Sequence, residues 1–429
     1  MNKDLYIIEG VRTPFCKMGT ELMEEDAVSL GTFATKGLLA KTGLDPNWID
    51  EVIYGCVCQP IDSANVTRII ALRSGIPKEK PAYTVHRNCA SGLEALTQAY
   101  DKINSGAGDL FVVGGVESMS QVPFIYRPSA VKKFSALARC KTTISKCKTL
   151  ASFRIGDFNP IIGLKLGLKD PFAAMNMGET AELLSSEFKI SREEQDHFSL
   201  QSHHKAVKAR KSLAEEILPV YFNKKIRSHY YCNRDNGPRE NQNLSALAKL
   251  RPVFDRKNGT VTAGNASQIT DGAVSLLVAS EQAVKKHGLN PIGRLSSYAY
   301  SGCDPSRMGL GPIHAMNKLE SKSKYTIKDA DIFEINEAFA SQVLACKKAS
   351  QSEEFCKKIL KRDRILGEIP EDLLNVNGGS ISLGHPVGAS GARLALTSIY
   401  ELNRRKAKRA LISLCIGGGQ GGAAWIEAA

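Results

Sequence analysis

The 429-residue chain has no apolar run of about 18 residues, so its sequence offers no candidate transmembrane helix. The first ten residues lack the charged and then apolar plan of a secretory signal peptide, and they are typical of a first strand. The whole chain has a net charge of +13, and acidic residues are missing from Gln121 to Gly156. No cysteines with zinc-site spacing come with partner ligands, so no metal site is expected.

A disulfide framework is not expected either. Eleven cysteines is an odd number, and the chain shows no export signal. Thiols that stay reduced can act as nucleophiles, which favours a reducing, cytoplasmic compartment. The length exceeds that of one typical hydrophobic core, so the sequence predicts two or more packed units.

The positive charge is concentrated in one segment. The basic residues between positions 121 and 156 are Arg127, Lys132, Lys133, Arg139, Lys141, Lys146, Lys148 and Arg154. Such a segment suits anionic lipid headgroups, nucleic acid or a phosphorylated cofactor. A basic face that is simply solvated explains it equally well.

Two regions of the chain resemble each other. Ala90-Ser91-Gly92 is echoed by Ala389-Ser390-Gly391, and each is followed by a helical pattern and an apolar run that ends in glycines. Segments 50–55 and 329–334 form an earlier matched pair in the same order. Short Val, Ile and Leu runs that alternate with helical patterns predict buried sheets. The sequence therefore predicts two similar α/β halves.

Between the halves, residues 123–250 lack the strand and helix alternation, which indicates an insertion laid over the first half. Helices are predicted from Met177 to Phe188 and from Ser191 to Ala209, the second opening with a capping box. The polar segment from Asn223 to Asn243 is predicted to be a surface loop. The expected units are 1–122 together with 251–284, the insertion 123–250, and 285–429.

Cys89 follows a strand-like segment and precedes a helical one. A thiol near a helix N-terminus is expected to favour the thiolate, because the dipole and free N–H groups stabilise negative charge. A thiolate attacks carbonyl carbon readily, which favours covalent catalysis. A single cysteine is more often a small buried hydrophobe. Here the following Ala, Ser and Gly leave room for a ligand.

His385 and Cys415 stand in similar small-residue surroundings. His385 precedes a second helical pattern, where its imidazole could accept a proton from a thiol. Cys415 ends a strand pattern just before three glycines, whose N–H groups could stabilise an oxyanion. Gly417 begins a spacing that matches a dinucleotide fingerprint, but no helix and further strand follow it. A nucleotide-binding fold is therefore rejected.

Asn336 lies between an apolar strand pattern and a helical pattern. Its structural explanation is an N-cap, which suits an Asn before a helix. Its functional explanation is that the side chain holds a water molecule in the site. The two roles are compatible.

These motifs, in this order, resemble the thiolase family of acyl-CoA:acetyl-CoA acyltransferases, and the likeness runs from Val11 to the Cys415 block. The resemblance implies a fold of two similar five-layered αβαβα halves with an inserted loop domain. It implies that Cys89 is the acylated nucleophile, that His385 activates thiols, and that Cys415 exchanges a proton with the acetyl carbon.

The same resemblance implies two oxyanion holes, one from His385 and an Asn336-bound water and one from the N–H groups of Cys89 and Gly417. Ser267 and Met177 would contact coenzyme A. The implied reaction is thiolytic cleavage of 3-ketoacyl-CoA by coenzyme A, with no permanently bound cofactor and no metal. The alternative is biosynthetic condensation of two acetyl-CoA molecules.

Some features depart from the family pattern. Asn176 stands where many short-chain members carry His, and Gln268 stands where Gly is common. The basic insert from Arg127 to Arg154 resembles that of the thiolase subunit of the fatty-acid oxidation trifunctional complex. Asn336 and the Cys415 block instead resemble the biosynthetic group. Both thiolytic cleavage and biosynthetic condensation therefore stay open as the direction of the reaction.

Two other classes of protein are less compatible with the sequence. A decarboxylating condensing enzyme would lack the second thiol, and a non-catalytic acyl-CoA-binding protein would lack a reactive residue. The resemblance further implies a homodimer or tetramer, and no nucleic-acid partner. For the basic insert, three explanations stay open: a solvated face, contact with a membrane or a hydratase–dehydrogenase subunit, and attraction of coenzyme A phosphates.

Overall fold

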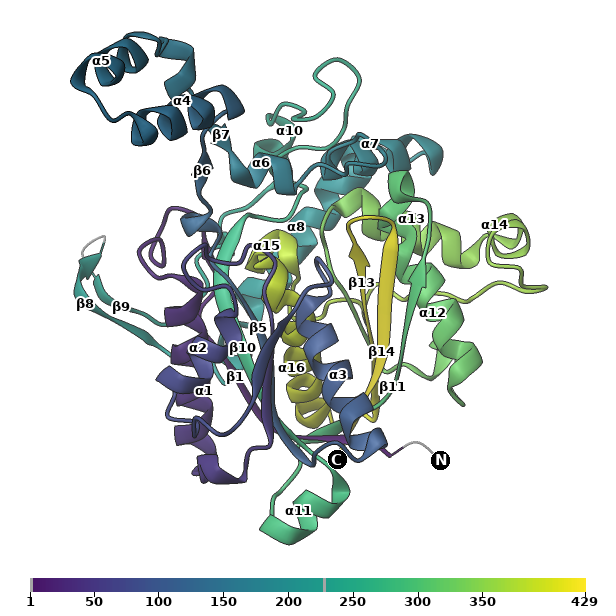
Figure 1. The fold of residues 1–429 in the computed structure, drawn as a ribbon. Helices are drawn as coiled ribbons and strands as arrows, with labels where there is room; N and C mark the ends of the chain where they lie inside the picture. The colour runs from purple at the N-terminus through teal and green to yellow at the C-terminus, as the bar shows by residue number, and fades with distance from the viewer. Residues whose placement is uncertain (1–2, 227–228) are drawn as a thin grey trace.

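The computed structural model describes residues 3–226 and 229–429. One ten-stranded mixed sheet runs through it in the order β12-β13-β14-β11-β1-β10-β5-β3-β4, with β2 paired to β10 (Figure 1). The first half of this sheet comprises β1 (Leu5–Arg12), β2 (Cys16–Lys17), β3 (Glu51–Gly55), β4 (Ala82–Val85), β5 (Leu110–Glu117) and β10 (Thr270–Ala279). The second half comprises β11 (Gly293–Gly302), β12 (Ile332–Ile335), β13 (Arg409–Ile416) and β14 (Gln420–Ala428).

The two halves have matching strand orders. In the first, β3 and β5 are parallel, and β10 and β1 continue the sheet antiparallel. In the second, β12 and β13 are parallel, and β14 and β11 continue it in the same way. A short pairing of β1 with β11 joins the halves. The internal repeat predicted from the sequence is thus present as two equivalent half-sheets.

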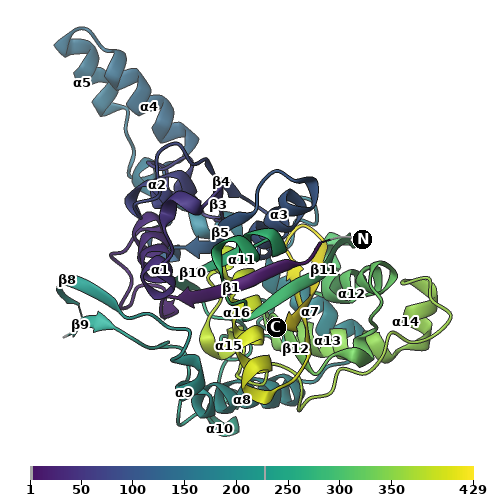
Figure 2. The same cartoon turned by 90° about the horizontal axis from the view of Figure 1, so that it is seen from below.

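The helices form layers around these half-sheets. The first half carries α1 (Ala27–Thr42), α2 (Val66–Arg73), α3 (Ser91–Ser105) and α11 (Glu281–His287). The second carries α12 (Gly311–Lys322), α13 (Ala340–Gln351), α14 (Glu353–Lys358), α15 (Ser380–Leu383) and α16 (Val387–Arg405). Helices α3 and α16 pack against each other between the half-sheets, α1 and α2 cover the outer face of the first, and α12 and α13 that of the second (Figure 2). This is the predicted five-layered arrangement.

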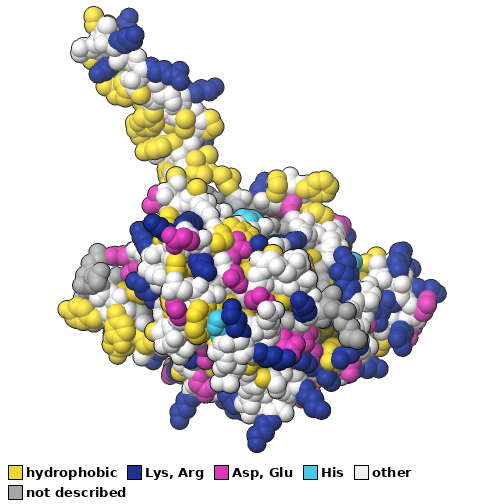
Figure 3. Space-filling model, turned by 60° about the horizontal axis from the view of Figure 1, so that its bottom comes forward, with side chains coloured by type: hydrophobic (Ala, Val, Ile, Leu, Met, Phe, Trp, Pro, Cys, Tyr) yellow, Lys and Arg dark blue, Asp and Glu magenta, His cyan; other side chains and the backbone are white. Residues whose placement is uncertain are grey.

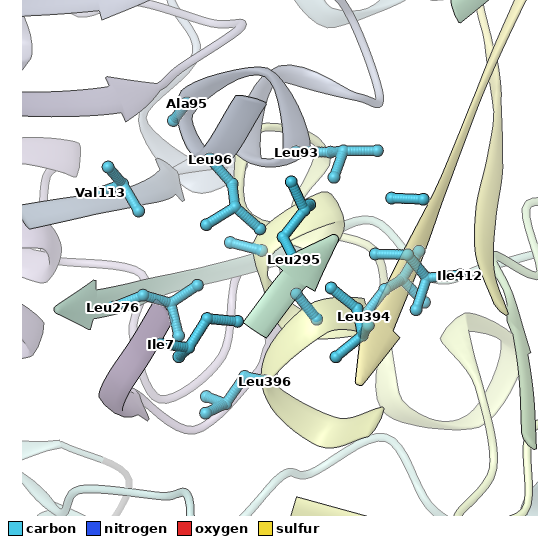
Figure 4. Close-up of a cluster of buried hydrophobic side chains, with 14 of the residues drawn as sticks. Ile7, Leu93, Ala95, Leu96, Val113, Leu276, Leu295, Leu394, Leu396 and Ile412 are labelled. Atoms are coloured by element: carbon cyan, nitrogen blue, oxygen red, sulfur yellow. The ribbon is translucent and has the colours of Figure 1, made fainter. Parts of the chain in front are cut away.

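The central layer holds the main hydrophobic core. Leu93 and Leu96 of α3 meet Leu394 and Leu396 of α16, and side chains from strands of both halves close the cluster (Figure 4). The helices approach closely because small residues face each other at the crossing. A Cβ atom on Gly92 would lie 2.8 Å from the backbone nitrogen of Ala392.

The insertion comprises β6 (Phe124–Ile125), α4 (Pro128–Arg139), α5 (Thr143–Ala151), β7 (Ile161–Ile162), α6 (Gly163–Gly167), α7 (Met177–Glu187), α8 (Arg192–Lys208), α9 (Arg210–Leu213), β8 (Val220–Ile226), β9 (His229–Cys232) and α10 (Leu244–Ala248). Helices α7 and α8 confirm the two predicted helices, and Ser191 and Glu194 form the predicted capping box. The predicted boundaries of the three units stay predictions.

Two expectations about the insertion are wrong. The segment from Asn223 to Asn243 is not a loop throughout, because β8 and β9 pair as an antiparallel hairpin within it. The basic segment does not lie over the first half: α4 and α5 form a helical hairpin that projects away from the body on the β6–β7 ribbon (Figures 1 and 2). In the described part of the chain, no helix has the length and apolar character needed to cross a membrane.

Candidate active site

Cys89 lies in the turn between β4 and α3, two residues before the helix begins. The preceding Asn88 adopts a left-handed backbone conformation with φ of 43°. Ser91 holds this turn, since its hydroxyl donates to the Asn88 carbonyl and accepts from the Arg87 N–H. The turn thereby presents the half-buried thiol of Cys89 in front of the helix.

The electrostatics of Cys89 differ from the sequence-based expectation. Burial raises the pKa of the thiol, while backbone N–H groups of Gly417 and Cys89 itself lower it, and the negative charge of Glu117 raises it further. Because the net pKa is raised, a resting thiolate is not what this site favours. A base must take the Cys89 proton before the sulfur can attack a carbonyl carbon.

Cys415 and Gly417 come from the opposite half. Strand β13 ends one residue after Cys415, and Gly417, Gly418 and Gly419 form the turn into β14. Asn88 donates its side-chain amide to the Gly417 carbonyl at 2.7 Å, which fastens this turn to the Cys89 turn. Burial raises the pKa of the Cys415 thiol well above its usual value, and the nearby Cys89 raises it further. Two protonated thiols and the Gly417 N–H, which faces the Cys89 sulfur, therefore meet where the halves join.

His385 lies between α15 and α16 and is 7% exposed. Its backbone N–H is held by the Gln268 carbonyl and the Thr270 hydroxyl. The Ser390 hydroxyl lies 2.5 Å from Nδ1 of the ring and donates to the Pro386 carbonyl at 3.0 Å. We assign the single hydroxyl proton to the bond with the Pro386 carbonyl, so that Nδ1 donates to Ser390 and the lone pair lies on Nε2.

The Nε2 atom of His385 is buried and has no hydrogen-bond partner among the described residues. Burial, and next the positive charge of Arg393, lower the pKa of the imidazole to about 4. The ring is therefore neutral at neutral pH, with a vacant acceptor on the nitrogen that faces away from Ser390. Such a group can take a proton and return it.

Asn336 is fully buried in the loop that follows β12. Its Oδ1 accepts from the Ser380 hydroxyl at 2.7 Å, and its Nδ2 has no partner among residues 3–226 and 229–429. The N-cap interpretation is wrong, because α13 begins four residues later and Phe339 occupies its N-cap without a side-chain bond. The amide therefore remains available as a donor next to the α15 turn that leads to His385.

Met177 lies in the insertion, and Ser267 lies in the segment that leads from the insertion into β10; both lie near the candidate site. Met177 begins α7 and packs in one cluster with Cys415, its sulfur 3.5 Å from where a Cβ atom on Gly417 would stand. Ser267 is half-buried, and its backbone N–H donates to the Ala338 carbonyl in the Asn336 loop. Met177 thus contacts the Cys415 side of the site, and Ser267 lies beside the Asn336 side.

The two departures from the family pattern have structural roles here. Asn176 caps α7, forming a reciprocal capping box with Glu179. Gln268 donates its side-chain amide to the Ile381 carbonyl at 3.2 Å, while its own carbonyl holds the His385 backbone. Gln268 therefore bridges α15 and the segment around His385.

Glu117 is a buried acid that was not predicted as a site residue from the sequence. It accepts from the backbone N–H groups of Val57, Cys58 and Gly388, and thereby ties the end of β5 to the start of α16. Burial raises the pKa of this carboxyl to about 7. Its position at a strand end, before a polar Ser-Met-Ser run, could have marked it as a residue that anchors loops.

Taken together, the contacts join Cys89, Gly417, Cys415 and Met177 directly, and they join Asn336 and His385 through the α15 segment. The chemistry available is a thiol nucleophile, a neutral imidazole base, a second thiol and the N–H donors of Gly417 and the Asn336 amide. No group of three or more metal-ligating side chains occurs in the part of the chain that the structure describes.

Comparisons with known proteins identify the family of this arrangement. Residues 5–282 match the family model described as thiolase, N-terminal domain, and residues 289–428 match thiolase, C-terminal domain. A probable acetyl-CoA acyltransferase of Staphylococcus aureus is 39% identical over 419 residues, covering 97% of each chain. A Staphylococcus epidermidis protein of the same description is equally similar.

Solved structures agree over the full length. A Bacillus anthracis acetyl-CoA acetyltransferase is 35% identical with a TM-score of 0.87, and the match covers 100% of both chains. Human mitochondrial 3-ketoacyl-CoA thiolase in complex with CoA is 36% identical with a TM-score of 0.84, and the match covers 100% of this chain and 98% of the human one.

Proposed function

This chain belongs to the thiolase family, and on that premise we propose that it is an acyl-CoA C-acyltransferase that cleaves 3-ketoacyl-CoA with coenzyme A. The products are acetyl-CoA and an acyl-CoA shortened by two carbons. The observation that carries the proposal is the meeting of the Cys89 and Cys415 thiols with the Gly417 N–H, across the junction of the two halves.

In the first step, Cys89 attacks the keto carbon while His385 takes the thiol proton on Nε2. The Cys89 and Gly417 N–H groups stabilise the oxyanion that forms on the attacked carbonyl. The carbon–carbon bond then breaks, and its electron pair passes to the acetyl-CoA enolate. Cys415 protonates that enolate, while Asn336 and His385 support its oxygen through a water molecule.

In the second step, coenzyme A removes the acyl group from Cys89. His385 first returns the proton taken from Cys89 to the Cys415 thiolate, which frees Nε2 to take the proton of the incoming coenzyme A thiol. The coenzyme A sulfur then forms a bond to the acyl carbon, the bond from that carbon to Cys89 breaks, and the departing Cys89 thiolate takes the proton back from His385. Ser267 and Met177 are proposed to contact coenzyme A, supported by their places beside Asn336 and Cys415. Coenzyme A and acyl-CoA are substrates here, and the mechanism requires no permanently bound cofactor. The free thiols suit a reducing compartment.

Thiolysis rates over a ladder of 3-ketoacyl-CoA lengths test the direction. Rates that hold or rise beyond the four-carbon substrate support the degradative proposal. A sharp preference for four carbons, with condensation of acetyl-CoA, would favour the biosynthetic alternative instead. That alternative is supported by the Bacillus anthracis acetyl-CoA acetyltransferase, which is as similar as the human thiolase.

We also propose that the chain forms a homo-oligomer. Strand β4 stands at one end of the sheet order, so one side of it is unpaired within residues 3–226 and 229–429. An unpaired edge can template pairing with a second chain. Light scattering coupled to size exclusion should give the mass of a dimer or tetramer, and a monomer mass at micromolar concentration would refute this.

For the basic insert, we propose peripheral docking of the α4–α5 hairpin on an anionic membrane. Apolar side chains gather along one flank of the hairpin and Lys and Arg along the other (Figure 3). Ile144, Leu150 and Ile155 are 72%, 54% and 94% exposed. The single nearby acid, Asp157, is paired with Lys133 at 2.6 Å. An apolar flank beside unopposed cations suits a headgroup layer.

Co-sedimentation with vesicles of phosphatidylcholine, with and without phosphatidylglycerol, tests this. The intact chain should pellet only with the anionic vesicles, and Ile144→Ser together with Ile155→Ser should reduce pelleting. The control carries Lys286→Glu and Lys357→Glu on other exposed surfaces and should pellet like the intact chain. Equal pelleting of the intact chain and a variant lacking 128–154, or capture only by a hydratase–dehydrogenase subunit, would overturn the membrane proposal.

A further inference from the structure

Two cysteines outside the proposed catalytic site face each other at the base of the insertion. Cys16 lies in β2 and Cys232 ends β9, and their sulfur atoms are 3.5 Å apart although 216 positions separate them in the chain. Neither residue is used in the proposed acyl transfer. Both sulfurs are thiols in this structure.

The backbones that carry the two thiols are already fastened to each other. On one side of Cys16, the Phe15 N–H donates to Asp235 at 2.7 Å, and on the other the Lys17 N–H donates to Asn236 at 2.8 Å. Asp235 also holds the buried Arg12 guanidinium in two hydrogen bonds. The sulfurs therefore face each other because a polar clamp on both sides of Cys16 holds the two segments in place.

Only one of the two thiols opens toward solvent. Cys16 is fully buried, whereas Cys232, although only 6% exposed, lines a hollow of about 670 Å³ together with Arg210, Lys211 and Arg234. Glu21 and Asp235 line the same hollow and oppose these cations in part. The hydrogen bond from Cys16 lowers the pKa of Cys232, so the accessible thiol is also the readier nucleophile.

We propose that Cys16 and Cys232 are a reversible disulfide-forming site whose co-reactant is a small anionic disulfide of the oxidised-glutathione class. The Cys232 thiolate attacks one sulfur of the small disulfide and expels one thiolate. The Cys16 sulfur then attacks the Cys232 sulfur while its proton passes to the departing small thiolate, which leaves as the second small thiol. Two protein thiols are oxidised to one protein disulfide, and one small disulfide is reduced to two small thiols.

Closing the bond moves the sulfurs from 3.5 Å to about 2.05 Å, a shift that side-chain rotation and a small adjustment of β2 can supply. The new bond ties the β8–β9 hairpin to the first half of the sheet. Because it restricts the unfolded chain, oxidation should raise the midpoint of thermal unfolding by about 2–5 °C. A reducing agent should restore the original midpoint.

The test is peptide mapping by mass spectrometry of the full chain after incubation with oxidised glutathione. The exposed Cys147 reports that the reagent reacts with accessible thiols. We expect two peptides joined by a disulfide between Cys16 and Cys232, and dithiothreitol should reduce that bond and separate them. In Cys16→Ser, glutathione should remain attached to Cys232, because no second thiol resolves the mixed disulfide. In Cys232→Ser, Cys16 should stay unmodified.

Free Cys16 and Cys232 in wild-type chain whose Cys147 is modified would overturn the inference. So would glutathione on Cys16 in the Cys232→Ser variant, because it would reverse the assigned order of attack. If either variant fails to fold, the peptide map of the wild-type chain is sufficient to test the proposed disulfide. Since linkage is read by mass, its outcome does not depend on whether the chain has thiolase activity.

Discussion

The two halves of the sheet share the order of four strands, and one connection between equivalent strands is very different in length. In the first half, β5 and β10 are separated by residues 118–269, which hold the whole insertion. In the second half, the equivalent β13 and β14 are joined by a three-glycine turn, Gly417 to Gly419. The tight turn places a thiol and a backbone N–H against the opposite half, whereas the long connection places Met177 and Ser267 over the junction.

Comparing the two halves also shows how the environments of Cys89 and His385 affect their pKa values. Cys89 precedes α3 and His385 precedes α16, and these helices are equivalent in the repeat. Burial acts on the two groups in opposite directions, raising the pKa of the thiol and lowering that of the imidazole. Both groups are therefore neutral at rest, and the proposed reaction must begin with a proton transfer between them.

Removing each thiol in turn gives the largest expected effect. Cys89→Ala should lower thiolysis on the order of 10⁴-fold or more and abolish the acyl-enzyme, because no nucleophile remains. Cys415→Ala should also lose carbon–carbon cleavage, but it should still exchange labelled coenzyme A with acyl-CoA through Cys89. Cys147→Ala, in the exposed hairpin, serves as the control. If Cys415→Ala loses the exchange of coenzyme A as completely as Cys89→Ala, then the proposed division of roles, acyl transfer by Cys89 and proton transfer by Cys415, is wrong.

Acid should reveal the buried imidazole. The pKa of His385 is about 4 in the folded chain against an ordinary 6.5, so between these values the unfolded state binds more protons. His385 therefore lowers stability as the pH falls from 6.5 to 4, by about 3 kcal/mol in full. Urea unfolding of wild type and His385→Asn should show that extra loss only in wild type. Parallel pH dependence in the two proteins would contradict the lowered pKa.

That comparison is needed because other groups titrate in the same range. Burial raises the pKa of Glu117 and of Glu334 to about 7, so these acids add stability as the pH falls from 7 toward 4.5. His203 has a pKa lowered to about 4, like His385. All three are present in both proteins, and their contributions cancel in the difference.

The repeated serines offer a matched pair. Ser390→Ala should lower kcat about 10–100-fold, because the His385 ring loses the partner that orients Nδ1. The hydroxyl of the equivalent Ser91 bonds the backbone of Arg87 and Asn88 and no catalytic side chain among the described residues, so Ser91→Ala should change kcat less than Ser390→Ala. Steady-state kinetics with a pH profile of kcat measures both. Equal losses in the two variants would show that Ser390 acts through the backbone alone.

The helix crossing should give the smallest effect. Gly92→Ala and Gly391→Ala each place a methyl group against the opposite helix, at 2.8 Å from Ala392 N and 2.4 Å from Leu93 N. Each should cost about 1–3 kcal/mol in the free energy of unfolding. Gly156→Ala, whose new Cβ atom meets open space, is the control. A loss confined to one helix would mean that the crossing is not symmetric.

Much of the architecture could be predicted because local patterns carry it. Apolar runs produced β5 and β13 where they were expected, and the capping box of α8 marked its first turn. The Asn336 N-cap failed because its side chain bonds Ser380, which a distant segment supplies. The β8–β9 hairpin was missed because the polar run from Asn223 to Lys225 interrupts its apolar residues, so that no period of two is visible.

By itself, the sequence determined the inventory: two thiols and an imidazole among small residues, and an amide between a strand and a helix, on two repeated halves. Only the tertiary structure decided which of these groups meet and in which protonation state, since the pKa of Cys89 and of His385 depends on burial by residues from the other parts of the chain. It also decided that Ser390 orients the ring and that Glu117 joins β5 to α16. Desolvation and hydrogen bonding are properties of a packed neighbourhood, and no linear pattern encodes them.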